Sequence, residues 1–237
     1  MNSQSNSDPA QHGNPPRSCR GFTVTELLVV IVIIAVLSTL AFAVFGRVAK
    51  AGSAATMTNN MRQIGSLIAL YAQDHNGTLP GPLHLGQRAI YRRSPPTHLA
   101  YHLQDYLDGG QKFDEGEQIE MLSSPMWRKQ SPTLRGISLL SQQDVDPDPR
   151  VTRSPWGYAG ATQGDPNRQP ITLSKLAGFR RVPWALIEAD REHPAVGSAG
   201  WRTEMPEKPV HGSYRLALKF DGSVVKRRLN EELEDER

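Results

Sequence analysis

Residues 27–46 of this chain read LLVVIVIIAVLSTLAFAVFG, twenty consecutive residues without a charged side chain. Ser38 and Thr39 carry the only hydroxyl groups in the segment. An α-helix rises about 1.5 Å per residue, so a helix of this length spans roughly 30 Å, the thickness of the hydrocarbon core of a bilayer. We therefore expect a transmembrane helix at about residues 27–46, attached to a more polar remainder of the chain.

The ten residues before this segment indicate what kind of membrane protein it is. They read Arg17-Ser18-Cys19-Arg20-Gly21-Phe22-Thr23-Val24-Thr25-Glu26. This run closely resembles the type III signal sequence of type IV prepilins and type II secretion pseudopilins. The resemblance implies that a prepilin peptidase cleaves after Gly21, removes residues 1–21 as a leader peptide and methylates Phe22 as the new N-terminus. It also implies that Glu26, the fifth residue after cleavage, takes part in assembly.

Glu26 is unusual on physical grounds as well. It is the only charged residue among residues 22–46, and an ionisable group in or beside a membrane segment is costly and commonly functional. A cation nearby would lower that cost, and cleavage would create one, the α-amine of Phe22. The resemblance implies that this pair forms between neighbouring subunits. Gly21 suits the scissile position because glycine leaves the backbone flexible and unhindered.

Other N-terminal signals fit the sequence less well. Ala41-Phe42-Ala43 has the form of a secretory signal-peptidase site, but the apolar segment exceeds the usual length and Glu26 would interrupt the signal. A lipoprotein signal at Cys19 would need an apolar stretch before it, which the sequence lacks. A plain signal anchor leaves the Gly-Phe-x-x-x-Glu spacing as a coincidence.

The orientation of the apolar segment does not follow from its flanking charges. Two basic residues precede it and three follow it closely, which is nearly a tie under the positive-inside rule. These residues are Arg17 and Arg20, then Arg47, Lys50 and Arg62. The resemblance implies a single-pass protein of the bacterial inner membrane, with its N-terminus in the cytoplasm and its head in the periplasm.

Beyond Gly46 the helical pattern continues but becomes amphipathic. Apolar residues recur at intervals of four and three, which places them in one stripe along a helix; they are Met57, Met61, Ile64, Ile68 and Tyr71. His75-Asn76-Gly77 then supplies a stop signal. We expect one long helix over residues 22–77, whose second half packs on the sheet of a head domain at 78–237.

The head is expected to complete an α+β fold with a small antiparallel β-sheet and long loops. A short helix after Ser94-Pro95-Pro96-Thr97 would bury one apolar side, consisting of Leu99, Leu103, Tyr106 and Leu107. Residues 131–165 have the composition of a loop, and strands are expected at 184–189, 214–220 and 223–226. Asp221-Gly222 between the last two strands predicts a two-residue type I′ turn, in which both central residues have positive φ.

The same hairpin carries a second resemblance. His211, nine intervening residues, then Asp221-Gly222 is similar to an H-x9-DG motif near the C-terminus of many pseudopilin-like proteins. A turn dipeptide after an unrelated histidine would give the same pattern. The sequence predicts no biochemical role for these three residues.

Composition and motifs exclude several functions. The 27 basic residues nearly balance the 24 acidic ones, so no nucleic-acid binding is expected. One cysteine, Cys19, permits no intramolecular disulfide, and we find no catalytic signature such as HExxH or a nucleophile elbow.

Two groups of residues invite a metal-binding hypothesis. Asp144, Asp146 and Asp148 alternate in one stretch, and major pseudopilins often hold calcium in a head loop. Three carboxylates fall short of the six to eight oxygens that calcium prefers, so a solvated acidic loop is the simpler interpretation and no cofactor is expected. His98, His102 and Asp105 share one face of a helix, where a polar outer surface is again simpler than a metal site.

Together these features predict a structural protein and not an enzyme. We expect a pseudopilin subunit of a type II secretion-like system, assembled into a periplasmic pseudopilus for protein export. Its expected partners are prepilin peptidase, other pseudopilin subunits, the inner-membrane secretion platform and membrane lipid. The alternatives are a type IV pilus subunit for adhesion, motility or DNA uptake, and a non-polymerising, membrane-anchored periplasmic binding protein.

Overall fold

The computed structural model describes residues 22–143, 154–162, 164–179 and 184–229, with the backbone alone at 42–44 and 166. The chain divides into two compact units, with the boundary between Gly46 and Arg47. Helix α1 (Val24–Asp74) contributes to both units. The other helices and strands are β1 Gly86–Arg88, α2 Leu99–His102, α3 Pro125–Gln130, β2 Ile137–Ser141, α4 Leu173–Leu176, β3 Leu186–Glu188, β4 Tyr214–Leu218 and β5 Val224–Arg228, with short 3-10 helices at Leu107–Gly109, Glu120–Leu122, Pro166–Arg168, Pro194–Val196 and Gly200–Glu204.

In the N-terminal unit, α1 presents apolar side chains all around its circumference. Leu27, Ile34 and Leu40 are 59%, 56% and 64% exposed. Valine and isoleucine are only moderate helix formers in water, but in hydrocarbon the backbone must satisfy its own hydrogen bonds, which favours a helix. Among the described residues, α1 is the one helix that is long and apolar enough to cross a membrane.

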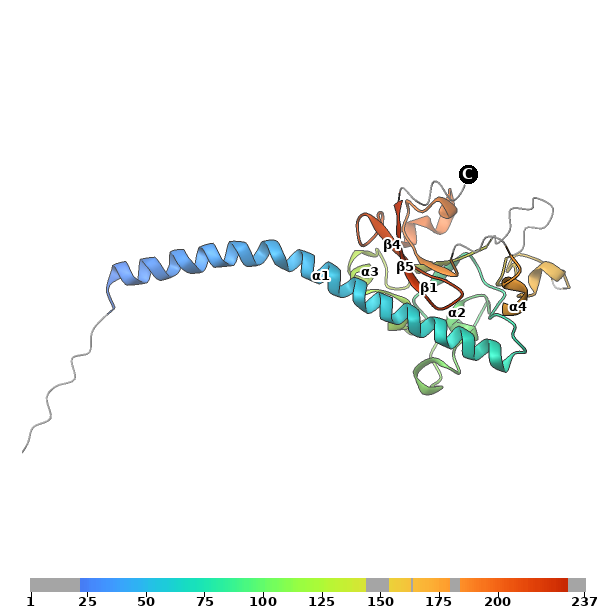
Figure 1. Ribbon diagram of the computed structural model, residues 1–237. Coiled ribbons are helices and arrows are strands. Elements are labelled where there is room, and N and C mark those ends of the chain that lie inside the picture. Colours follow the sequence, from blue (N-terminus) through green and yellow to red (C-terminus); the bar gives the residue numbers. More distant parts are fainter. Residues whose placement is uncertain (1–21, 144–153, 163, 180–183, 230–237) are drawn as a thin grey trace, which may run out of the picture. The chain divides into compact units, whose positions relative to one another are not determined.

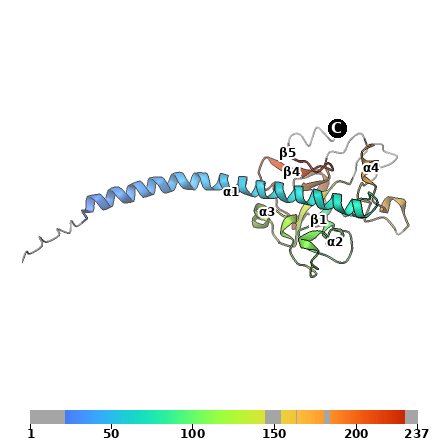
Figure 2. The same ribbon diagram turned by 60° about the horizontal axis from the view of Figure 1, so that its bottom comes forward.

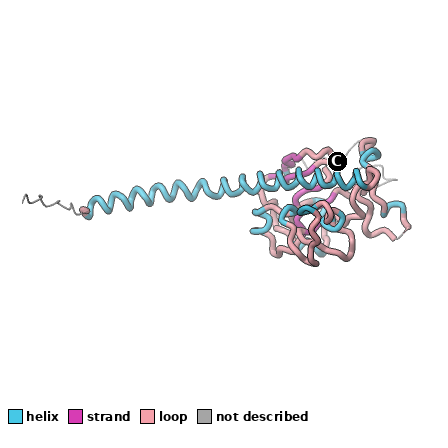
Figure 3. The backbone as a smooth tube through the Cα atoms, turned by 90° about the horizontal axis from the view of Figure 1, so that it is seen from below, coloured by secondary structure: helices cyan, strands magenta, loops and turns pink. Residues whose placement is uncertain are grey.

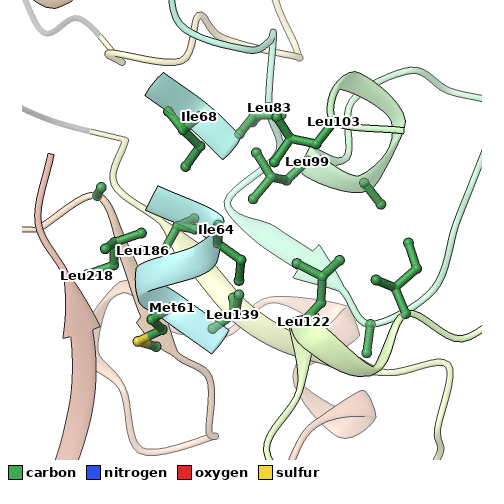
Figure 4. Close-up of a cluster of buried hydrophobic side chains, with 14 of the residues drawn as sticks. Met61, Ile64, Ile68, Leu83, Leu99, Leu103, Leu122, Leu139, Leu186 and Leu218 are labelled. Atoms are coloured by element: carbon green, nitrogen blue, oxygen red, sulfur yellow. The ribbon is translucent and has the colours of Figure 1, made fainter. Parts of the chain in front are cut away.

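In the C-terminal unit, α1 supplies one side of the main core. Met57, Met61, Ile64 and Ile68 are buried and Tyr71 is half-buried, which confirms the predicted stripe. Figure 4 shows Met61, Ile64 and Ile68 meeting leucines from the sheet and from the segments between α1 and β2; these are Leu139, Leu186, Leu218, Leu83, Leu99, Leu103 and Leu122. Truncating one such residue to alanine typically removes about 2–5 kcal/mol of stability.

The helix ends where the sequence predicts. After Asp74, Asn76 and Gly77 adopt positive φ angles of 55° and 79°. The N–H of Gly77 donates to the carbonyl of Ala72 at 2.6 Å. Asparagine and glycine tolerate the left-handed conformation that closes a helix in this way.

The sheet has five antiparallel strands in the order β1-β2-β3-β4-β5. Leu139, Leu186 and Leu218 belong to the core that α1 covers, whereas their neighbours Leu140, Ile187 and Ala217 belong to a second cluster on the other face. Figures 1 and 2 show the second half of α1 running alongside this sheet. The expected α+β fold, with a long helix and a small antiparallel sheet, is confirmed.

The interpretation of residues 131–165 as loop is wrong at Ile137–Ser141. These residues form β2, and all five are buried. The strand could not be recognised from its residue pattern, because Ser138 and Ser141 interrupt its apolar residues. Burial of Ser141 is possible because its hydroxyl donates to the carbonyl of His84 at 2.8 Å.

The sequence analysis also missed β1. Its three residues, Gly86, Gln87 and Arg88, have no strand pattern. Gly86 leaves room for Ile137, because a Cβ atom at position 86 would lie 2.7 Å from Cδ1 of Ile137 and would force that side chain to shift. The polar Gln87 is buried, and its amide oxygen accepts a hydrogen bond from the N–H of Leu99.

The helix expected after Thr97 is broken into two pieces. Leu99, Leu103 and Leu107 are buried as expected, but the α-helical part covers Leu99–His102 and a 3-10 helix covers Leu107–Gly109. The predicted strand at 184–189 is likewise shorter, since β3 covers Leu186–Glu188. Loops make up most of the head, as Figure 3 shows.

The hairpin between β4 and β5 exists, but its turn differs from the prediction. Gly222 has a φ of 82°, whereas Asp221 is not among the described residues with positive φ. The N–H of Gly222 donates to the carbonyl of Lys219 at 3.0 Å, and the N–H of Lys219 donates to the carbonyl of Ser223 at 2.8 Å. The loop therefore has three residues and ends in a left-handed glycine. Asp221 favours this form because its carboxylate accepts the N–H of Ser223 at 2.8 Å.

Candidate functional site

The N-terminus of α1 is organised by two residues that cap each other. The hydroxyl of Thr23 accepts the N–H of Glu26 at 3.2 Å. In return, Oε2 of Glu26 accepts the N–H of Thr23 at 2.9 Å and its hydroxyl at 2.8 Å. This is the reciprocal arrangement of a capping box, which satisfies donors that a helix start otherwise leaves open. The carboxylate is thus held at the positive end of the helix, where a negative charge is stabilised.

The predicted processing residues sit next to this cap. Phe22 precedes Thr23 and is 77% exposed. Gly21 and the rest of the leader at 1–21 lie outside the described residues, so cleavage after Gly21 stays a prediction. Phe22 and Glu26 belong to the same end of the same helix, as the sequence requires for a shared role.

His211 occupies a different kind of environment, in the interior of the head. Its Nε2 lies 3.1 Å from Oε2 of Glu188, and the two side chains are 1% and 6% exposed. The imidazole ring stacks on Tyr214 with ring centroids 5.1 Å apart, and Nζ of Lys226 lies 5.1 Å from the centre of the Tyr214 ring. Burial and the charge of Glu188 raise the pKa of Tyr214.

Glu188 ties His211 to the end of a strand pair. The β3–β4 pairing ends at Ile187 and Ala217, and the N–H of Leu216 donates instead to Oε2 of Glu188 at 3.0 Å. The Glu188 carboxylate therefore takes the place of a backbone carbonyl as the acceptor for the Leu216 N–H, and it also contacts the His211 ring. A pair this deeply buried cannot touch a substrate in this conformation, so its geometry indicates a role in fixing the strand end.

A second buried ionic pair joins Arg215 of β4 to Asp190, which follows β3 in the chain. Nε and Nη2 of Arg215 donate to the two carboxylate oxygens of Asp190 at 2.6 and 2.9 Å. Both side chains are nearly inaccessible, at 2% and 1% exposure. Nearby His193 is also buried, and its pKa is lowered to about 3 by burial and by the charges of Arg215 and Arg227.

The structure does not bring the three residues of the H-x9-DG pattern together. His211 precedes β4, whereas Asp221 and Gly222 follow it in the hairpin loop. The five residues of β4 extend about 3.4 Å each, or roughly 17 Å in all. The histidine serves the buried pair and the dipeptide serves the turn, each with its own contacts.

The metal-binding hypotheses have different outcomes. Asp144, Asp146 and Asp148 lie outside the described residues, so calcium binding there remains untested. Within the described part of the chain, no cluster of three or more His, Cys, Asp or Glu side chains is arranged to hold a metal ion.

The predicted polar outer face at His98 is wrong. His98 is 5% exposed, and burial, followed by the charge of Arg88, lowers its pKa to about 3. His102 turns Nε2 to the carbonyl of Pro96 at 3.1 Å. The helix is too short to have an outer face at both positions, because His98 is its N-cap residue and it ends at His102.

Four residues with notable contacts escaped the sequence analysis. Thr23 had a readable signal, since Thr-x-x-Glu before an apolar run is the pattern of a capping box. Glu188, Asp190 and Arg215 gave only a weak one, because charges at strand ends usually face solvent. Each of these three residues is buried against a partner that lies more than twenty positions away from it in the chain.

Comparison with known proteins bears on the N-terminal segment. Residues 16–42 match the family model of the prokaryotic N-terminal methylation motif. Neither the curated proteins nor the solved structures contain a significant match to the chain. The motif match supports a type IV pilin-like subunit in general.

Several properties follow at this coarse level. The motif implies processing by prepilin peptidase and assembly with other pilin-like subunits. The single apolar N-terminal helix suggests a single-pass membrane anchor. A structural motif of this type also suggests a non-enzymatic subunit. It does not distinguish a pseudopilin from a pilus subunit.

Proposed function

We propose that this protein is a structural pseudopilin of a type II secretion-like system, assembled through its N-terminal helix into a periplasmic pseudopilus for protein export. One observation carries the proposal: the methylation motif leads directly into a helix whose apolar side chains are exposed on every side. Such a surface needs lipid or other apolar helices around it. The N-terminus would lie in the cytoplasm and the head in the periplasm.

Processing would create the charge that Glu26 needs. Removal of residues 1–21 leaves the α-amine of Phe22 at the positive end of α1, which is an unfavourable place for a cation. The Glu26 carboxylate is already held there by Thr23 through Oε2. A second carboxylate, from a neighbouring subunit, would neutralise the amine in surroundings of low dielectric constant, where an unpaired charge is expensive.

The same geometry explains why a charge pair would govern assembly. Moving the apolar helix from lipid into a bundle of similar helices changes its hydrophobic environment little. Apolar burial therefore does little to set the position of one subunit relative to the next. The position of one amine against one carboxylate would then fix how far each subunit advances along its neighbour. Glu26 would act as this register point.

Replacement of Glu26 tests the proposal. Glu26→Ala should leave processing and membrane insertion intact, because it removes a charge beside the apolar segment, but it should abolish assembly. The matched control is Glu207→Ala, which removes a carboxylate that is 79% exposed in the head. The measurement is the yield of crosslinked oligomer or sheared filament at equal membrane abundance.

The possible results separate the candidate functions. Wild type and Glu207→Ala should assemble equally, and Glu26→Ala should not. Equal yields from all three proteins would contradict the pairing mechanism. Absence of oligomer even in the wild type would favour a membrane-anchored binding protein that does not polymerise. Filaments that shear from the cell surface, and are not retained in the periplasm, would favour a type IV pilus subunit.

A further inference from the structure

The head contains a cavity of about 730 Å³, and assembly through the N-terminal helix gives this cavity no role. It lies beside the edge strand β1, and its walls come from residues 83–98, from Ile137, Gln143 and Trp201, and from a later segment that supplies Ser154, Tyr158, Ala159 and Asn167. This volume is within the usual range of roughly 300–1,000 Å³ for pockets that bind small organic molecules. The cavity therefore has the size of a ligand site.

The walls combine apolar surfaces with positive charge. Leu83, Leu85 and Trp201 are among the lining residues, together with Tyr158. Tyr158 is 56% exposed, which is high for a large aromatic residue in a folded head. Arginines supply both charges, and no acidic side chain is among the described residues that line the cavity. An apolar molecule with a negative group would match this lining.

The two arginines are not equivalent. The guanidinium of Arg88 forms a close ion pair with Glu204 and also donates to the carbonyl of Arg135 at 2.8 Å. Arg92 has a weaker partner, since its Nε lies 3.9 Å from Oε1 of Glu115, whose side chain is 57% exposed. The cavity wall thus holds about one positive charge that is poorly compensated. This suits a monoanion better than a doubly charged group.

His98 adds a buried imidazole ring to the cavity wall. It lines the cavity, it is 5% exposed, and its Nδ1 finds no hydrogen-bond partner among the described residues. This Nδ1 has almost no accessible surface, so it cannot reach a molecule in the cavity, and the ring serves as part of the wall.

We propose that this cavity binds a carboxylate attached to an apolar body, with Arg92 on the carboxylate and Tyr158 and Trp201 on the apolar part. Guanidinium and carboxylate groups are planar and match each other through paired hydrogen bonds. This chemistry belongs both to a free organic acid and to the C-terminal residue of a polypeptide that ends in an apolar side chain. The two sources need different probes.

Binding to the full-length protein in detergent tests the proposal by titration calorimetry. The probes are phenylacetate and the peptide acid acetyl-Ala-Ala-Phe, each compared with its uncharged amide. Each acid that binds should do so about tenfold or more tightly than its amide, as expected for a charge-assisted hydrogen bond. Preference for the peptide acid identifies a polypeptide end as the ligand, and equal binding of phenylacetate identifies a free acid; either result supports the site.

Variants tie the binding to the cavity. Arg92→Gln should remove the preference for acid over amide, and Tyr158→Ala should weaken both. The matched control is Arg93→Gln, which changes the next arginine in the chain, one that does not line the cavity. Unchanged thermal unfolding of these variants excludes misfolding. The proposal is overturned if neither acid binds the wild type, or if Arg92→Gln and Arg93→Gln bind the acids equally.

Discussion

Removing Asp190 should destabilise the head more than any surface change, because it takes away the carboxylate that pairs with a buried guanidinium. Arg215 is 2% exposed and makes two short hydrogen bonds to the Asp190 carboxylate. Removing one partner of such a pair typically costs about 3–5 kcal/mol, a large part of the stability of an ordinary domain. For a head of this size, Asp190→Ala should lower the melting temperature by roughly 6–20 °C.

A second substitution separates the buried charge from other causes of instability. Asp190→Ala combined with Arg215→Met removes both charges and keeps an apolar side chain of similar length. The double variant should recover most of the lost stability, since replacing a buried ion pair by apolar residues is often close to neutral. Circular dichroism melts of the full-length protein in detergent, at low and high salt, measure both effects.

An exposed pair on the same segment serves as the control. Arg191 and Glu207 approach to 3.5 Å, but Glu207 is 79% exposed, so Glu207→Ala should change stability by less than about 1 kcal/mol. The reasoning would be refuted if Asp190→Ala melted like Glu207→Ala. It would also be refuted if the double variant were destabilised by the sum of its single changes.

Three further predictions concern the hairpin, its contact with α1 and the buried histidines. Gly222→Val should destabilise the head by about 1–3 kcal/mol, because a β-branched residue resists the φ of 82° at that position; an unchanged urea midpoint would contradict the turn assignment. Gly65→Val should cost about 1–3 kcal/mol through overpacking, because a Cβ atom there would lie 3.2 Å from Cδ1 of Leu218 and 3.4 Å from the Cα of Gly222. Gly52→Val, where a Cβ atom would meet nothing within 4 Å, is the control, and equal melting of the two variants would count against close packing. The pKa values of His98 and His193 fall from 6.5 to about 3 on folding, so their contribution to stability is complete above pH 6.5 and is lost as the pH falls from there toward 3. Lowering the pH from about 7 to about 5 should remove roughly 2 kcal/mol for each histidine, and replacing both with glutamine should flatten this part of the pH profile.

The parts of the fold that could be predicted from the sequence are those with a residue pattern that repeats over many neighbouring positions. The stripe from Met57 to Ile68 and the uncharged run at 27–46 each repeat over many residues, so single exceptions do not hide them. The strand β2 is five residues long and carries two serines. Its burial is decided by neighbours in the sheet, and a short window of sequence does not contain them.

In the candidate site, too, contacts between residues close in the sequence could be predicted, and contacts between distant residues could not. Phe22 and Glu26 are four residues apart and could be read directly, whereas the contacts of His211 could not. His211 precedes β4 and contacts Glu188 in the neighbouring strand β3, at a separation of 23 positions in the chain. The Asp221-Gly222 turn shows a third case: the dipeptide located the hairpin, but the Ser223 hydrogen bond to Asp221 selected a longer loop than the dipeptide alone suggests.

The N-terminus of the protein recovered from membranes tests the central claim most directly. Intact mass and N-terminal sequencing of the full-length gene product, expressed together with a prepilin peptidase, read the cleavage site and the methyl group in one preparation. We expect a chain of 216 of the 237 residues that begins with N-methylated Phe22. A chain that begins at Val44, after Ala41-Phe42-Ala43, would identify a secretory signal peptide and contradict the pilin-like account.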